Sequence, residues 1–220
     1  MKLLLTSNGL SNQSIAKALF EMVGKPAAET TIAFIPTAVN VGRSDKGWFV
    51  NDLNNLDKQG LKCLDIVDIS ALPKNIWLPR LEAADVLFFS GGNTYHLMRW
   101  LDESGLSELL PELLKTRVYA GISAGSIVTN PSLALSSKDK KIYYEEQFGY
   151  NNDKGLGFVD FYFRPHFNSP SFPHASKEYL ESIAKDIPGV IYALDNESAV
   201  SFVDGKIEII SEGEYLILNK

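Results

Sequence analysis

The sequence predicts an α/β protein in which helices cover both faces of a mostly parallel sheet. Short apolar runs that suit buried strands alternate with stretches in which apolar residues recur every three or four positions. Prolines and glycines punctuate the connections between these runs. From residue 190 onward the pattern changes to short strands joined by tight turns, which favours antiparallel strands near the C-terminus. Together these observations predict a three-layer sandwich.

The length and composition suit one soluble domain over residues 1–220. The chain is 45% hydrophobic and 22% charged, which is ordinary for a globular protein. Its net charge of −6 comes without a cluster of Lys and Arg, which argues against a nucleic-acid partner. The apolar run Leu3–Leu5 stops at Thr6, and no run is long enough to cross a membrane. We therefore expect a cytoplasmic protein that does not contact membranes.

The parallel part of the sheet is expected to come from the first two thirds of the chain. Its strands are predicted at residues 3–6, 31–36, 63–67, 84–89 and 118–121, and another strand at 158–163. Helical spacing predicts a helix that Ser11 caps, one over 48–60, one that Asn93 or Thr94 caps and one after His174. The segment 70–81 is expected to be loop or short helix, and 130–156 to form loops around the site. Cys63 has no cysteine partner and is expected to be a buried strand residue.

The end of the chain is predicted to extend the same sheet with antiparallel strands. These strands are expected at 190–194, 198–203, 206–211 and 215–218, with hairpin turns at Asp204–Gly205 and Glu212–Gly213. In such sheets ligands bind beyond the carboxyl ends of the parallel strands. The candidate motifs fall there.

The sequence Gly121-Ile-Ser-Ala-Gly125 follows a strand-like run and precedes a short apolar segment. A G-x-S-x-G pattern in a strand–turn–helix setting is typical of a nucleophile elbow. Glycines are needed on both sides because bulkier residues would clash on so sharp a turn. Ser123 is therefore the candidate nucleophile, and the amide of Ala124 a candidate donor to an oxyanion. The same pattern also arises by chance in loops, so its meaning depends on the rest of the chain.

Two further segments supply candidate partners for the serine. Ser90-Gly-Gly-Asn-Thr94 opens a helix after a strand, and the amide of Gly92 is a second candidate oxyanion donor. The alternative is a tight turn alone. His166 stands at a strand end after Pro165, which suits a general base; the alternative is a histidine bonded for structure. His96 is expected to serve packing and His174 to be solvated.

Three signatures resemble those of the peptidase E (aspartyl dipeptidase) and cyanophycinase group of serine peptidases. They are Phe88–Thr94, Gly121–Gly125 and Pro165–Phe167, in the same order and at similar spacing, and the resemblance covers nearly the whole chain. It implies a fold like the class I glutamine amidotransferases, with serine in place of cysteine. It implies Ser123 as nucleophile, His166 as base, the amides of Gly92 and Ala124 as oxyanion hole and Asn93 as substrate-binding. A small peptide is then the expected substrate, with no cofactor and no metal; a homodimer is left open.

This sequence departs from the family pattern at two places. The third triad member is usually a glutamate, but the closest match here is Asn196, with Asp195 or Glu197 as alternatives if the register shifts by one. An amide can orient an imidazole but stabilises its cation less than a carboxylate does. Aspartyl dipeptidases also have an arginine after the histidine, where this chain has Lys177. Lysine lacks the bidentate fork, so a strict preference for N-terminal Asp is not expected.

The sequence thus predicts a serine hydrolase of small peptides that resembles a dipeptidase and forms an acyl-enzyme on Ser123. One alternative is an α/β-hydrolase-type esterase, in which an acid before the histidine would complete the triad. The candidates for that acid are Asp139, Glu145 and Glu146. A second alternative is a catalytically weakened relative that binds a ligand, because Asn196 replaces the acid.

Overall fold

A seven-stranded sheet in the order β3-β2-β4-β5-β1-β8-β9 forms the centre of the computed structural model, which describes residues 1–220. Its strands are β1 (Lys2–Thr6), β2 (Thr31–Ile35), β3 (Cys63–Ile66), β4 (Val86–Phe89), β5 (Val118–Ile122), β8 (Ser198–Val203) and β9 (Lys206–Ser211). The first five strands pair in parallel, while β8 and β9 join the sheet antiparallel. The predicted α/β class, with antiparallel strands near the C-terminus, is confirmed.

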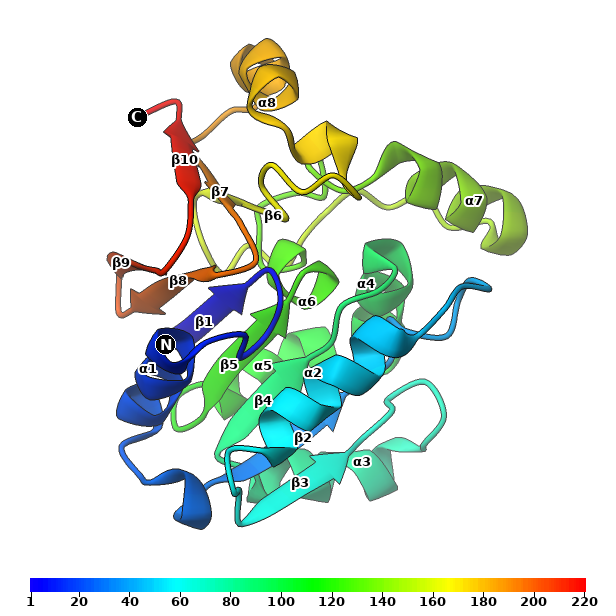
Figure 1. Ribbon diagram of the computed structural model, residues 1–220. Coiled ribbons are helices and arrows are strands. Elements are labelled where there is room, and N and C mark those ends of the chain that lie inside the picture. The colour runs from blue at the N-terminus through cyan, green and yellow to red at the C-terminus, as the bar shows by residue number, and fades with distance from the viewer.

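The helices cover both faces of this sheet. They are α1 (Gln13–Val23), α2 (Gly47–Asp57), α3 (Lys74–Ala83), α4 (Thr94–Glu103), α5 (Leu106–Leu113), α6 (Ala124–Ile127), α7 (Lys138–Phe148) and α8 (Lys177–Ile183), with 3-10 turns at Ala27–Glu29, Pro173–Ala175 and Ala184–Asp186. Figure 1 shows α1 and α2 on one face of the sheet and α3, α4 and α5 on the other. None of the helices is long and apolar enough to cross a membrane.

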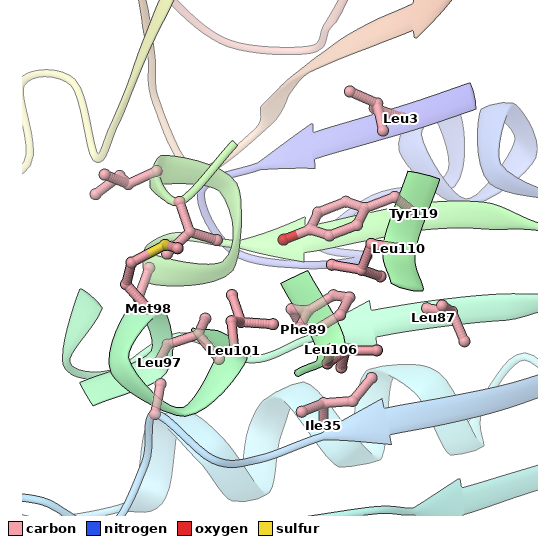
Figure 2. Packing of buried hydrophobic residues seen from close by; sticks show 14 of the residues in the cluster. Leu3, Ile35, Leu87, Phe89, Leu97, Met98, Leu101, Leu106, Leu110 and Tyr119 are labelled. Carbon is pink, nitrogen blue, oxygen red and sulfur yellow. The ribbon is translucent and has the colours of Figure 1, made fainter. Parts of the chain in front are cut away.

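Two hydrophobic clusters hold the three layers together, because successive strand residues point to opposite faces. In β1, Leu4 joins the cluster under α1 and α2, while Leu3 and Leu5 join the larger cluster under α3, α4 and α5. The same alternation holds in the neighbouring strands β2, β4 and β5. Figure 2 shows the larger cluster, in which Phe89 of β4 stacks on Tyr119 of β5 at a centroid distance of 4.6 Å. Apart from Lys2 and Thr31 at their first positions, these four strands are buried, and they therefore support the turns that follow them rigidly.

The rest of the C-terminal region forms a second, mixed sheet instead of extending the first. Its order is β10-β7-β6, from the strands β6 (Tyr162–Pro165), β7 (Ile191–Leu194) and β10 (Tyr215–Leu218). The Asp204–Gly205 hairpin is confirmed, with φ of 48° and 87° as such turns require. The expected hairpin at Glu212–Gly213 is wrong, because β10 pairs with β7 and not with β9. Between β9 and β10 the chain passes from the first sheet to the second.

Three local predictions need correction. Cys63 is exposed, because β3 is an edge strand with β2 as its single neighbour. Asn12, not Ser11, caps α1, since its side chain accepts the N–H of Ile15. The segment 130–156 is not loop throughout, because α7 lies within it and is capped by Ser137. Figure 1 shows α7 and α8, with the small sheet, at the end of the main sheet toward which β1 and β5 point.

Candidate active site

Ser123 directly follows β5, which lies between β1 and β4. Its backbone has φ 48° and ψ −100°, a combination that side-chain-bearing residues rarely adopt. The turn is held from both sides: the Ser123 N–H donates to the carbonyl of Thr6 at 2.9 Å, and its own carbonyl accepts the N–H groups of Ser126 and Ile127. Ser123 therefore stands on a sharp bend at the carboxyl edge of the sheet, as the elbow motif predicts.

The two glycines of the motif are required by contact with main chain. A Cβ on Gly121 would lie 2.6 Å from the carbonyl carbon of Gly125. A Cβ on Gly125 would lie 2.3 Å from the carbonyl oxygen of Phe89, at the end of β4. Neither neighbour is a flexible side chain that could move aside. The motif thus reflects the close passage of α6 over the ends of β4 and β5.

The end of β1 is bonded into the same turn. Ser126 Oγ accepts the N–H of Thr6 at 3.0 Å and donates to its carbonyl at 2.8 Å. Thr6 Oγ1 in turn donates to the carbonyl of Gly121 at 2.7 Å. All of these groups are buried, so their hydrogen bonds are shielded from competition with water. Three adjacent elements are therefore fixed around the nucleophile.

His166 follows β6 of the small sheet, and its Nε2 lies 2.9 Å from Ser123 Oγ. Its main chain has φ 63°, and its N–H donates to Ser7 Oγ, which itself donates to the carbonyl of Leu194 in β7. The imidazole stacks on Phe172 with ring centroids 3.9 Å apart and planes inclined by 9°. The small sheet thus delivers the ring, and Ser7 after β1 connects it to the main sheet.

The environment of His166 keeps its ring neutral. The pKa of His166 is lowered to about 4, mainly by burial and also by the positive charges of Arg164 and Lys140, against the hydrogen bond to Asn196, which raises it. A neutral ring is the form that can accept a proton. His166 is therefore in the protonation state of a base over the physiological range of pH.

Asn196 is the residue that contacts the far nitrogen of this ring. Its Oδ1 lies 2.9 Å from His166 Nδ1. Because an amide oxygen can only accept, Nδ1 carries the hydrogen and Nε2 is left free to accept the serine proton. The neighbouring acids are engaged elsewhere: Asp195 accepts the hydroxyl of Ser198 and the N–H groups of Glu197 and Glu214, and Glu197 accepts the amide of Asn12.

The other candidate acids do not meet the histidine. None of the three carboxylates considered for the esterase alternative is hydrogen-bonded to His166. They are Asp139, Glu145 and Glu146, all on α7. The two remaining histidines lie where the sequence predicts. His96 Nδ1 lies 2.9 Å from the hydroxyl of Tyr144, which is a packing role, and His174 is exposed.

The candidate oxyanion donors are unbonded amides. Neither the N–H of Gly92 nor that of Ala124 donates a hydrogen bond within the protein. Gly92 has φ 135°, and a Cβ on it would lie 2.1 Å from the carbonyl oxygen of Ala38. Its own carbonyl accepts Lys140 Nζ at 2.7 Å. Only glycine fits this position, and the hydrogen bond from Lys140 holds its carbonyl group.

Asn93 serves as the cap of α4. Its Oδ1 accepts the N–H groups of Tyr95 at 2.9 Å and His96 at 3.1 Å, and its N–H donates to the carbonyl of Ala38. The predicted cap is therefore confirmed at Asn93. Asn93 also lines the cavity beside Ser123.

A cavity of about 660 Å³ opens in front of Ser123 and His166. The residues that line it include Trp48, Asp52 and Lys140, which the sequence analysis does not place at the site. Asp52 carried a usable signal, because it lies three positions after Phe49 and four before Leu56, on the apolar side of α2. Lys140 carried none, since it stands among other charged residues on α7. Burial lowers the pKa of Lys140, and so do the nearby charges of Arg164 and Lys46.

A serine on a constrained turn, bonded to a neutral imidazole whose other nitrogen is held, is the arrangement of a serine hydrolase. The fold places this pair where parallel sheets bind their ligands. The fold and the site together therefore indicate a protein of the serine hydrolase class.

The chain belongs to Peptidase family S51, whose sequence pattern matches residues 3–210. An uncharacterized peptidase of Listeria monocytogenes is 30% identical over 187 residues, which cover 83% of this chain and 85% of the relative. Peptidase E of Haemophilus influenzae is 28% identical over 194 residues, or 86% of this chain and 84% of that protein. The resemblance seen in the three signatures is confirmed, and the protein is a serine peptidase similar to peptidase E.

Solved structures support the same fold. A putative peptidase E protein from Listeria monocytogenes superposes with a TM-score of 0.79 at 24% identity, covering 96% of this chain and 98% of that one. A peptidase from an acI-B1 actinobacterium gives 0.73 at 18% identity, covering 99% and 90%.

Proposed function

We propose that this peptidase cleaves small peptides, as a dipeptidase does, through an acyl-enzyme on Ser123. The observation that carries the proposal is the 2.9 Å separation between Ser123 Oγ and His166 Nε2 on a turn held by main-chain contacts. At this distance the hydroxyl can pass its proton to the ring as it attacks.

In the first step Ser123 Oγ bonds to the carbonyl carbon of the peptide and His166 Nε2 takes the hydroxyl proton. The carbonyl electron pair moves to oxygen, and the amides of Gly92 and Ala124 stabilise that negative charge. When the intermediate collapses, the C–N bond breaks and the leaving amine takes the proton from Nε2. Water then attacks the ester with His166 as base, which releases the acid and restores Ser123.

Asn196 orients the ring in this scheme. Its Oδ1 accepts the Nδ1 hydrogen in both the neutral ring and the imidazolium, so the ring does not turn during proton transfer. The amide carries no full charge, so it stabilises the imidazolium less than a glutamate would. We therefore expect a working but slower site than one with an acid at this place.

The size and charges of the cavity support a small peptide as substrate. A volume of about 660 Å³ suits a small molecule. Arg43, Lys46 and Lys140 border it and supply positive charge for a peptide carboxylate. Lys177 does not border it and instead pairs with Glu181 at 3.9 Å. A carboxylate would thus meet Lys140 and its neighbours, not the lysine that follows the histidine in sequence.

The test is hydrolysis of a panel of dipeptides by wild type and Ser123→Ala. We expect the variant to lose at least about a thousandfold in kcat, because no other hydroxyl stands on the elbow. A fluorophosphonate should label wild type but not Ser123→Ala. Ser171→Ala is the matched control, since it also borders the cavity and should keep both activity and labelling. Retained hydrolysis in Ser123→Ala would refute the proposal.

A further inference from the structure

Asp52 is a buried carboxyl group without a partner inside the candidate active site. The residue is 4% exposed, and its Oδ2 is buried with no hydrogen bond. No ion pair or hydrogen bond involves either of its oxygens. It borders the same cavity as Ser123 and His166, yet the proposed chemistry does not use it.

Such a group destabilises the folded chain unless something offsets its charge. A carboxylate removed from water without hydrogen bonds is unfavourable by several kcal/mol, so the proton is held more tightly. Burial alone raises the pKa of Asp52 to about 7. An unpartnered acid of this kind in a cavity is expected where the partner arrives with a ligand.

Asp52 lies near the residue that precedes Ser123. A Cβ added to Gly9 would lie 4.0 Å from Asp52 Oδ1 and 3.0 Å from the side chain of Ile122. A Cβ added to Gly91 would lie 3.5 Å from the ring of Trp48, one turn earlier on α2, and 3.6 Å from Ser123 Cβ. Thus α2 places an indole and a carboxyl along the cavity wall beside the serine.

The positive groups of the cavity do not neutralise this carboxyl. Arg43, Lys46 and Lys140 form no ion pair with Asp52, and neither does the ring of His166. Lys140 is instead bonded to the carbonyl of Gly92, on the oxyanion side of the serine. The cavity therefore holds separate negative and positive groups, which matches the two charged ends of a small peptide.

We propose that Asp52 binds the α-ammonium group of the peptide whose first carbonyl Ser123 attacks. This inference rests on the proposed peptidase function. The α-ammonium is two bonds from the carbonyl carbon that Ser123 attacks, so it lies in the cavity that Asp52 and Ser123 both line. It would supply the hydrogen bond and the opposite charge that the carboxyl group lacks. Asp52 would thus make the enzyme select peptides with a free N-terminus.

The experiment compares three peptides in wild type and Asp52→Asn. The best dipeptide of an Xaa-Ala panel is tested with a free amine and as its N-acetyl form, and N-acetyl-Lys-Ala carries an ammonium only on its side chain. We expect Asp52→Asn to raise KM for the free dipeptide about ten- to a hundredfold, with kcat changed much less. Wild type should strongly prefer the free form over the acetylated one. Asp57→Asn, an exposed acid on the same helix, is the control and should match wild type.

Binding without turnover separates this inference from the proposed mechanism. Calorimetry on Ser123→Ala should show the free dipeptide binding, and Ser123→Ala with Asp52→Asn should lose that affinity about ten- to a hundredfold. If Ser123→Ala still hydrolysed the dipeptide, the proposed function would fail, and the comparison of KM in Asp52→Asn and wild type would test Asp52 by itself. Equal KM in Asp52→Asn and wild type, equal binding in the two calorimetry proteins, or a loss confined to N-acetyl-Lys-Ala would each overturn the assignment. Circular dichroism verifies folding, which removal of a buried charge should not impair.

Discussion

Ser123 and His166 both have positive φ and meet at 2.9 Å, but the molecule holds them by different means. Around Ser123 the contacts are mostly with main-chain atoms, to which the hydroxyls of Ser126 and Thr6 are bonded, and Gly121 and Gly125 leave no room for a methyl group. Around His166 they come from side chains: the hydroxyl of Ser7, the amide of Asn196 and the ring of Phe172. The position of Ser123 is therefore fixed by packing that cannot relax, and that of His166 by contacts that can be removed one at a time.

The largest effect is expected from Gly125→Ala, which disturbs the main-chain packing around Ser123. Its Cβ would lie 2.3 Å from the Phe89 carbonyl oxygen, so α6 or β4 must shift. We expect a loss of about 3 kcal/mol in the free energy of unfolding and more than about a hundredfold in kcat. Denaturant unfolding and dipeptide hydrolysis measure both. Gly189→Ala, where the added atom would meet neighbours at an ordinary 3.5 Å, should be nearly silent; equal effects of the two changes would contradict the packing account.

A smaller and more selective effect is expected from Asn196→Ala, which removes one of the side-chain contacts that hold His166. The ring keeps its contact with Ser123 but loses the acceptor at Nδ1, so its tautomer and orientation are no longer fixed. We expect kcat to fall about a hundredfold while stability changes little. Steady-state kinetics beside thermal unfolding distinguish the two quantities. A variant as unstable as Gly125→Ala would show that the two halves are not held differently.

The pH profile tests the surroundings of His166 without removing one of its contacts. Because burial depresses the pKa of His166 to about 4, its ring is neutral above that pH, and kcat at saturating substrate should fall only as pH drops through about 4. Asn196→Asp places a carboxylate beside His166 Nδ1. Its negative charge favours the imidazolium and should move this acid limb to higher pH. Rates between pH 3 and 8, after verifying folding at each pH, measure the shift. An unchanged limb in Asn196→Asp would count against contact between residue 196 and the ring of His166.

The smallest effect is expected from Ser7→Ala, which touches only the link between the two sheets. The change removes the acceptor of the His166 N–H and the donor to the Leu194 carbonyl, both buried or nearly so. We expect about 1–3 kcal/mol less stability and a decrease of a few fold in kcat. Ser182→Ala, on the exposed side of α8, is the control for loss of a hydroxyl. A Ser7→Ala protein as stable as this control would mean that the small sheet positions His166 by itself.

The contrast between the halves also explains what could be predicted from sequence. The elbow of Ser123 depends on nearby glycines, so five consecutive residues carry its signal. The small sheet depends on pairing of β10 with β7, more than twenty residues away in the chain, so Glu212–Gly213 resembled a local hairpin. Cys63 was misjudged because an apolar run does not show which strand lies at the edge of a sheet.

The candidate site divides in the same way. Ser123, His166 and Asn196 stood in recognisable segments, and the structure brings them together. Asp52 stands on the apolar side of α2, which indicates burial but not the cavity, and Lys140 stands among other charged residues, so only tertiary packing places them in the cavity. Sequence reasoning finds residues whose requirement is local and misses those whose position depends on another element.

The buried carboxyl of Asp52 has a consequence for anyone who tries to make this protein more robust. Its pKa is raised from the ordinary 3.8 to about 7, so the folded chain holds a proton that the unfolded chain releases between these values. The free energy of unfolding therefore decreases as pH rises through that window, by up to about 4 kcal/mol, and stays low above it. A heat-tolerance screen at alkaline pH should consequently enrich neutral replacements at residue 52. Such clones would survive heating well and discriminate poorly among peptides.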